Sequence, residues 1–181
     1  TILENCALET EIDDLIAFLN AMGAHITRKE NRVIEIVGVP TLHGAIHKIM
    51  PDQNQAVSFA VAALATRGDI VVEHARPEDL QAFLETLDRI EAGYEVAHYG
   101  IRFFYKGPLH ATNVTTQIHP GFKTDWQPLW STLMTQAEGT SMLHETVQQN
   151  RFQYVAELQQ MGAQIEFFNP PVENPESVYN F

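Results

Sequence analysis

The sequence predicts a mixed α/β (α+β) fold built from repeated units of strand and helix. Three stretches share one layout, an amphipathic helix that runs into a glycine and then into a strand. The glycines of these stretches, Gly23, Gly93 and Gly162, are 70 and 69 positions apart. Between them, two apolar stretches end at Gly68 and Gly139, which are 71 positions apart. The same period in both sets indicates that one structural unit recurs along the chain.

The amphipathic stretches are 11–26, 77–96 and 152–165. Apolar residues recur at helical spacing in them, as Leu15, Phe18 and Met22 do in the first. Acidic residues crowd the first turns, where the helix dipole favours negative charge. We expect each glycine to form a left-handed cap, because a residue without a Cβ adopts that conformation at least cost.

The apolar stretches 56–68 and 127–139 predict buried helices, each followed by an extended run, 69–74 and 140–146. A strand pair is expected at 95–98 and 101–105, around a glycine. One unit is therefore strand, buried helix, strand, amphipathic helix and strand pair.

The repeats divide the chain at about 1–37 (partial), 38–107 (complete) and 108–181 (partial). The stretch 168–181 holds three prolines and is expected to be irregular. We interpret the chain as most of one domain of a longer protein.

Composition excludes several classes of function. The 181 residues carry 11 Lys and Arg against 23 Asp and Glu, a net charge of −12, which disfavours a nucleic-acid surface. Residue Cys6 is the one cysteine, so no internal disulfide can form. The most apolar run, 56–65, is about half the length that spans a bilayer. These features predict a cytoplasmic protein without a membrane segment.

Two familiar chemistries are disfavoured. His43 and His47 have the spacing of helical metal ligands, but Gly44 between them favours a strand or loop, and we expect no metal. Cys6 has no run of cations beside it and is interpreted as a small, partly buried residue.

The densest group of polar residues is 119–127, which contains a Pro-Gly turn, Lys123, Thr124 and Asp125. Because this stretch enters the next buried helix, Thr124 or Asp125 could be an ordinary helix cap. A carboxylate at that entrance could also lie beside a bound substrate.

A second candidate stretch, 143–152, lies where strand gives way to helix. Arg151 could bind a phosphate or carboxylate with its planar fork, or pair with an acid such as Glu157. Arg76 occupies the corresponding place in the preceding repeat, which favours a structural role for at least one of the two.

These residues resemble those of a known family. The strings at 119–127, 136–139, 144–147 and 150–152, with 3–12 and 42–52, are similar to the UDP-N-acetylglucosamine 1-carboxyvinyltransferases among the enolpyruvyl transferases. The resemblance covers nearly the whole chain and explains the repeats, since this family has two domains of three βαβαββ units each, an inside-out α/β barrel.

The resemblance implies transfer of the enolpyruvyl group of phosphoenolpyruvate to the 3-hydroxyl of UDP-N-acetylglucosamine, the first committed step of peptidoglycan synthesis, with no cofactor. It matches Asp125 to the catalytic general base. It matches Thr124 and Val147 to nucleotide-sugar contacts, and Arg151 to a cation at the rim of the active site. The partners it implies are the two substrates and a second domain of the same chain.

The sequence also departs from the family. Residues 51–57 lack its usual arginine, glutamate and glycine, and the family's phosphoenolpyruvate-binding Lys-Asn pair, loop cysteine and two further arginines have no counterpart. We therefore expect the chain to be inactive alone. One alternative is a non-catalytic paralogue that binds a nucleotide sugar; another is an enzyme with a shikimate-type acceptor, which the nucleotide-sugar motif disfavours.

Overall fold

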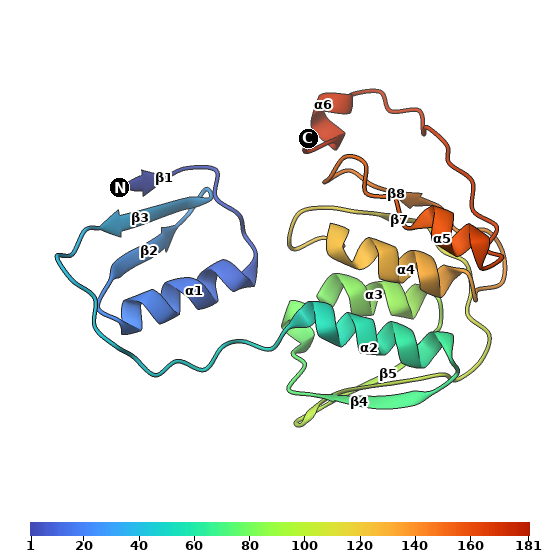
Figure 1. Ribbon diagram of the computed structural model, residues 1–181, viewed down its shortest axis with the longest axis horizontal. Coiled ribbons are helices and arrows are strands. Elements are labelled where there is room, and N and C mark those ends of the chain that lie inside the picture. The colour runs from blue at the N-terminus through green and yellow to red at the C-terminus, as the bar shows by residue number, and fades with distance from the viewer. The chain divides into compact units, whose positions relative to one another are not determined.

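The chain divides at Pro51 into two units. The computed structural model describes all residues from 1 to 181, and the units are Thr1–Pro51 and Asp52–Phe181 (Figure 1). Each unit is described by itself below. The expected repeat boundaries after residues 37 and 107 stay a prediction.

The first unit is a small sheet with one helix. Its elements are β1 (Ile2–Leu3), α1 (Thr10–Ala21), β2 (His25–Lys29) and β3 (Val33–Val37). The strands are antiparallel in the order β1-β3-β2. Helix α1 confirms the first predicted amphipathic helix and ends, as expected, in a left-handed glycine, Gly23, at φ +96°. No residue of α1 is fully buried, and Leu15 is 49% exposed.

The second unit begins with a helix, a strand, a second helix and a strand pair. Its elements are α2 (Gln53–Ala65), β4 (Asp69–Glu73), the 3₁₀ turn η1 (Pro77–Asp79), α3 (Gln81–Arg89), β5 (Gly93–Ala97) and β6 (Gly100–Phe104). The strands form an antiparallel sheet in the order β4-β6-β5. The order of helix, strand, helix and strand pair agrees with the later part of the predicted unit, whereas the nearest strand before α2 is β3, which belongs to the first unit.

The rest of the second unit carries the candidate motifs. Its elements are β7 (Val114–Thr115), the 3₁₀ turn η2 (Thr124–Trp126), α4 (Gln127–Met134), β8 (Leu143–His144), α5 (Val155–Gln160) and α6 (Pro175–Val178). Strands β7 and β8 are parallel neighbours. None of the helices combines the length and the hydrophobicity that a membrane-spanning helix needs.

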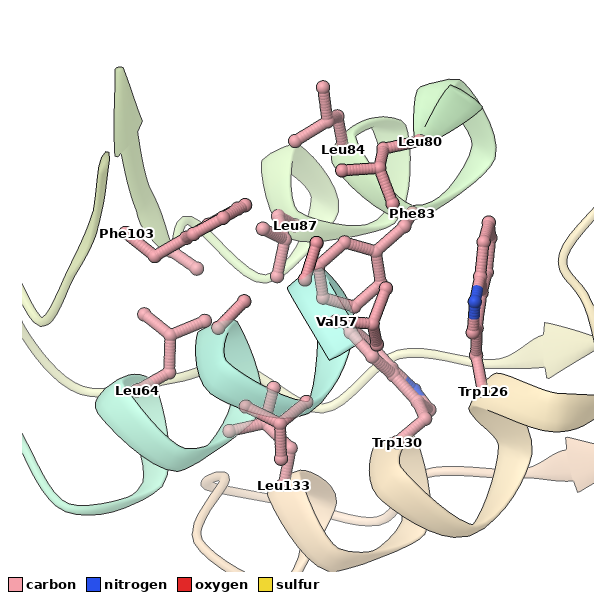
Figure 2. Packing of buried hydrophobic residues seen from close by; sticks show 14 of the residues in the cluster. Val57, Leu64, Leu80, Phe83, Leu84, Leu87, Phe103, Trp126, Trp130 and Leu133 are labelled. Carbon is pink, nitrogen blue, oxygen red and sulfur yellow. The ribbon is translucent and has the colours of Figure 1, made fainter. Parts of the chain in front are cut away.

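The core of the second unit lies between helices α2, α3 and α4 (Figures 1 and 2). The ring of Phe83 on α3 packs edge-on against Trp126 and Trp130, with centroids 5.9 and 6.0 Å apart. Such aromatic pairs add to the stabilisation that burial of apolar area provides. The cluster confirms that the apolar stretches form buried helices. Its contacts with Trp126 and Trp130 hold the N-terminal end of α4.

The prediction that Gly23, Gly93 and Gly162 form left-handed caps is wrong at Gly93. At the end of α3 the left-handed residue is Glu91, at φ +57°, and not Gly93. Gly93 begins β5 instead, and a Cβ there would lie 2.4 Å from the carbonyl oxygen of Phe104 on the paired strand. Close strand packing, and not a turn, therefore requires this glycine.

Three other expectations are corrected. The strand expected after Gly162 does not form, because no segment of the structure pairs with residues 163–165. The extended run at 140–146 pairs only over β8. The tail is not wholly irregular, since it forms α6 and the backbone N–H of Asn180 donates to the carbonyl of Thr146 at 2.8 Å.

Residues 51–57, which depart from the family pattern, form an ordered helix start. The Asp52 side chain accepts hydrogen bonds from the backbone N–H groups of Asn54 (2.8 Å) and Gln55 (3.1 Å). This is the geometry of an N-cap, which satisfies backbone donors that have no partner within the helix. The changed sequence therefore still begins α2 in a defined way.

Candidate functional site

The candidate site lies where the two parallel strands end. Thr115 of β7 is in register with His144 of β8, and the next residues are Thr116 and Glu145. Ligands of open α/β sheets bind outside the carboxyl ends of parallel strands. The segment after β8 and the 3₁₀ turn η2 meet at this edge, and they carry all four residues of the predicted site.

Glu145 connects the two segments. Its carboxylate oxygen Oε1 accepts hydrogen bonds from the hydroxyl of Thr116 (2.8 Å) and from the backbone N–H groups of Val147 (2.7 Å) and Gln148 (3.0 Å). Its other oxygen, Oε2, accepts from the hydroxyl of Thr124 at 2.8 Å. Only 7% of Glu145 is exposed, so these four donors replace the water that the carboxylate gives up.

Asp125 on η2 and Arg151 after β8 form an ion pair that also joins these two segments. The guanidinium Nη2 of Arg151 donates to Oδ1 of Asp125, while Nη1 donates to the side chain of Gln148. Half of the Asp125 side chain is exposed (50%), against a quarter of Arg151 (25%). The carboxylate is therefore held by a cation on one side and open to a ligand on the other.

The interpretation of Thr124 or Asp125 as a helix cap is wrong. Neither η2 nor α4 has a hydrogen bond from a capping side chain. The Thr124 hydroxyl points to Glu145 and the Asp125 carboxylate to Arg151. Both side chains instead join the turn to the segment after β8.

The alternatives for the arginines are also resolved. Arg151 pairs with Asp125 and not with Glu157. Arg76 pairs with Asp79, a buried carboxylate, at 2.5 Å between Nη2 and Oδ2. The arginine of the earlier repeat thus has a structural role at the start of α3, whereas Arg151 lies beside the candidate base.

Lys123 and Trp126, the residues on either side of Thr124 and Asp125, are buried. Lys123 is 7% exposed and its ammonium lies 6.0 Å from the centroid of the Trp126 ring. The indole N–H of Trp126 donates to Oδ1 of Asn54 at 2.9 Å. This bond ties the turn that carries Asp125 to the first turn of α2.

Tyr154 lies near the segment after β8 and shares a 2.7 Å hydrogen bond with Ser131. Burial raises the pKa of its hydroxyl because the phenolate would lose water, and the negative charge of Glu145 acts in the same direction. The hydrogen bond with Ser131 opposes this rise of the pKa. The carboxylate of Glu145 therefore acts electrostatically on its surroundings as well as through its hydrogen bonds.

The other residues considered from the sequence make local contacts. His43 Nδ1 lies 3.0 Å from the carbonyl of Gly44, and His47 Nε2 lies 3.1 Å from Asp14. Both histidines lie in a segment without regular structure, as expected. Cys6 is partly buried, and its thiol contacts the carbonyl of Leu3 at 3.4 Å.

Sequence reasoning missed Glu145 as a member of the site. It lies within residues 144–147, one of the strings that resemble the family, but the resemblance implied no role for it. A signal was available: an acidic residue lies near the end of the extended run predicted at 140–146 and directly precedes Thr146 and Val147. Acidic side chains are rarely buried unless they are paired, so burial at this place required a set of donors.

Comparison with protein families gives one match over almost the whole chain. The model described as EPSP synthase (3-phosphoshikimate 1-carboxyvinyltransferase) matches residues 1–178. It therefore covers both units, including all the residues of the candidate site.

Curated relatives have a more specific name. UDP-N-acetylglucosamine 1-carboxyvinyltransferase of Chlamydia muridarum is 45% identical over 170 residues, and that of Chlamydia abortus is 47% identical over 169. Each match covers 93% of this chain and 38% of the relative. The chain thus spans well under half the length of these relatives.

A solved structure shows the same fold. The enolpyruvyl transferase NikO of Streptomyces tendae matches with a TM-score of 0.74 and 24% sequence identity, over 88% of this chain and 38% of that one. This likeness confirms the predicted α/β fold of the enolpyruvyl transferases.

Proposed function

Because this chain belongs to the EPSP synthase family, we propose that it contributes the general base and part of the acceptor site to an enolpyruvyl transfer. The proposed reaction joins the enolpyruvyl group of phosphoenolpyruvate to the 3-hydroxyl of UDP-N-acetylglucosamine. A C–O bond forms between the sugar and C2 of phosphoenolpyruvate, the C2–O bond breaks with inorganic phosphate as the leaving group, and the general base takes up the hydroxyl proton. We further propose that the reaction serves peptidoglycan synthesis in the cytoplasm.

The observation that carries the proposal is the pairing of Asp125 with Arg151 at the end of strands β7 and β8. A general base must reach the proton that it takes, and the half-exposed carboxylate of Asp125 is accessible to a ligand. Arg151 stabilises the negative charge of the carboxylate and fixes its direction. Thr124 and Val147, which we propose as nucleotide-sugar contacts, lie on the same two segments.

The choice of UDP-N-acetylglucosamine as acceptor rests on the curated relatives, which bear that substrate in their names. The family description names a different acceptor, 3-phosphoshikimate. The proposal follows the relatives because their identity to this chain is 45–47% over 93% of its length.

We propose that most of the groups that bind the phosphates of the two substrates lie outside these residues. Two phosphate-bearing substrates require a cationic pocket. Arg151 and the buried Lys123 are the cations near Asp125 in the described site, and the chain as a whole carries a net charge of −12. We therefore propose that another domain of the same protein supplies most of the phosphate contacts.

The test measures phosphate release from phosphoenolpyruvate by the full gene product, with UDP-N-acetylglucosamine or 3-phosphoshikimate as acceptor. Release that depends on the nucleotide sugar supports the proposal, and release only with 3-phosphoshikimate overturns the choice of acceptor. Calorimetric binding of the nucleotide sugar without any release would instead support a non-catalytic nucleotide-sugar-binding protein.

A further inference from the structure

We propose that Glu145 is a positioning residue, which holds the segment of the general base and the segment of the sugar contact in one geometry. This inference rests on the proposed function, because it names what fixes that site. Its carboxylate accepts bonds from Thr124 on η2 and from Val147 and Gln148 after β8.

The segment after β8 needs such a link to η2 because no regular structure holds it at this point. Strand β8 ends at His144, and α5 begins only at Val155. The ion pair of Asp125 and Arg151 also joins the two segments. The Asp125 side chain is 50% exposed, however, so solvent weakens the ion pair. Glu145 is 7% exposed, so its hydrogen bonds lie where loss of a partner is costly.

Glu145 also limits what Thr124 and Val147 can offer a ligand. The hydroxyl proton of Thr124 is donated to Oε2, which leaves that hydroxyl only as an acceptor toward a substrate. The backbone N–H of Val147 donates to Oε1 of Glu145, so Val147 can contact a ligand only through its carbonyl and its side chain. The site therefore favours a ligand that brings its own hydrogen-bond donors, as a sugar with hydroxyl and amide groups does.

The test compares Glu145→Ala with Glu145→Gln in the full gene product. Glutamine can keep its oxygen at the place of Oε1, where three donors converge, and present its amide to the Thr124 hydroxyl, which then accepts. Alanine loses all four bonds. We expect Glu145→Ala to lower kcat by about tenfold or more and to raise KM for UDP-N-acetylglucosamine, because small misplacements of reacting groups are costly. Glu145→Gln should stay within about threefold of the wild type.

Asp79→Ala is the matched control. Asp79 is also a buried carboxylate, 5% exposed, and its partner Arg76 lies outside the site. Its loss should lower the thermal midpoint but leave kcat and KM unchanged. An unchanged kcat in Glu145→Ala, or an equal loss of kcat in Asp79→Ala, would overturn the positioning role.

Amide hydrogen exchange separates this inference from the proposed function. In Glu145→Ala the N–H groups of Val147 and Gln148 should lose protection, and in Glu145→Gln they should keep it. If the wild type releases no phosphate, the proposed function fails, but this exchange pattern still supports the positioning role. Protection that persists in Glu145→Ala overturns that role whatever the activity.

Discussion

The indole N–H of Trp126 donates a 2.9 Å hydrogen bond to the side-chain oxygen of Asn54. Trp126 follows directly after Asp125, and Asn54 lies in the first turn of α2, within the stretch that departs from the family pattern. The bond therefore connects the changed stretch to the turn that carries the proposed base.

Asn54→Ala should lower the free energy of unfolding by about 1–3 kcal/mol, because the indole N–H of a 1% exposed tryptophan would lose its partner. Urea unfolding of Asn54→Ala, Trp126→Phe and the double variant measures the coupling. The double variant should lose less than the two single losses added together. Strict additivity would show that the bond contributes nothing.

Gly93→Ala should destabilise the second unit by about 2 kcal/mol or more, since an overpacked core position cannot accommodate a methyl group. The new Cβ would lie 2.4 Å from the carbonyl oxygen and 2.6 Å from the ring of Phe104. Gly68→Ala is the control, because its Cβ would approach no atom closer than 3.5 Å. Urea midpoints compare the two, and an equal effect would contradict the packing argument.

Stability at alkaline pH should depend on Tyr154. Because burial raises its pKa in the folded state, the unfolded chain ionises first, near the ordinary value of about 10. The unfolded state then binds fewer protons, so stability falls as pH rises from about 10 through the folded pKa. Tyr154→Phe should flatten this loss in urea titrations at pH about 9 to 11. A slope equal to that of the wild type would contradict the raised pKa.

The helices and the long strands were predictable because they follow from local patterns. The apolar stretches at 56–68 and 127–139 contain most of α2 and the whole of α4, which end at Ala65 and Met134, and the glycine period indicated the recurring unit. Two features were not predictable, because each depends on a contact distant in sequence. Gly93 is required by Phe104 on the paired strand, and the strand expected at 163–165 finds no neighbour.

The sequence pointed to four residues that lie at this edge, but not to Glu145 or to the contacts among them. The motif resemblance pointed to Thr124, Asp125, Val147 and Arg151, and the structure brings all four to one edge. The Asp125–Arg151 pair spans 26 positions and the bond from Thr124 to Glu145 spans 21. No helical or strand periodicity reaches that far, so neither contact could be derived from spacing.

Arg151→Ala should lower kcat by about tenfold or more, because Asp125 would lose the cation that orients its carboxylate. The measurement is phosphate release by the full gene product at saturating substrates. Glu157→Ala is the control: this acid is the third residue of α5, Arg151 pairs with Asp125 instead of with it, and its loss should leave kcat unchanged. Equal losses in both variants would remove Arg151 from the site.

The most direct test of the account is the turnover of Asp125→Ala and Asp125→Asn in the full gene product with UDP-N-acetylglucosamine and phosphoenolpyruvate. Both variants lack the basic carboxylate, while asparagine keeps the shape of the side chain. Loss of a general base costs typically about 10² to 10⁴ in rate, so phosphate release should fall by that order in both, with the thermal midpoint of Asp125→Asn near that of the wild type. Turnover at the wild-type rate in either variant would contradict the assignment of Asp125 as the base.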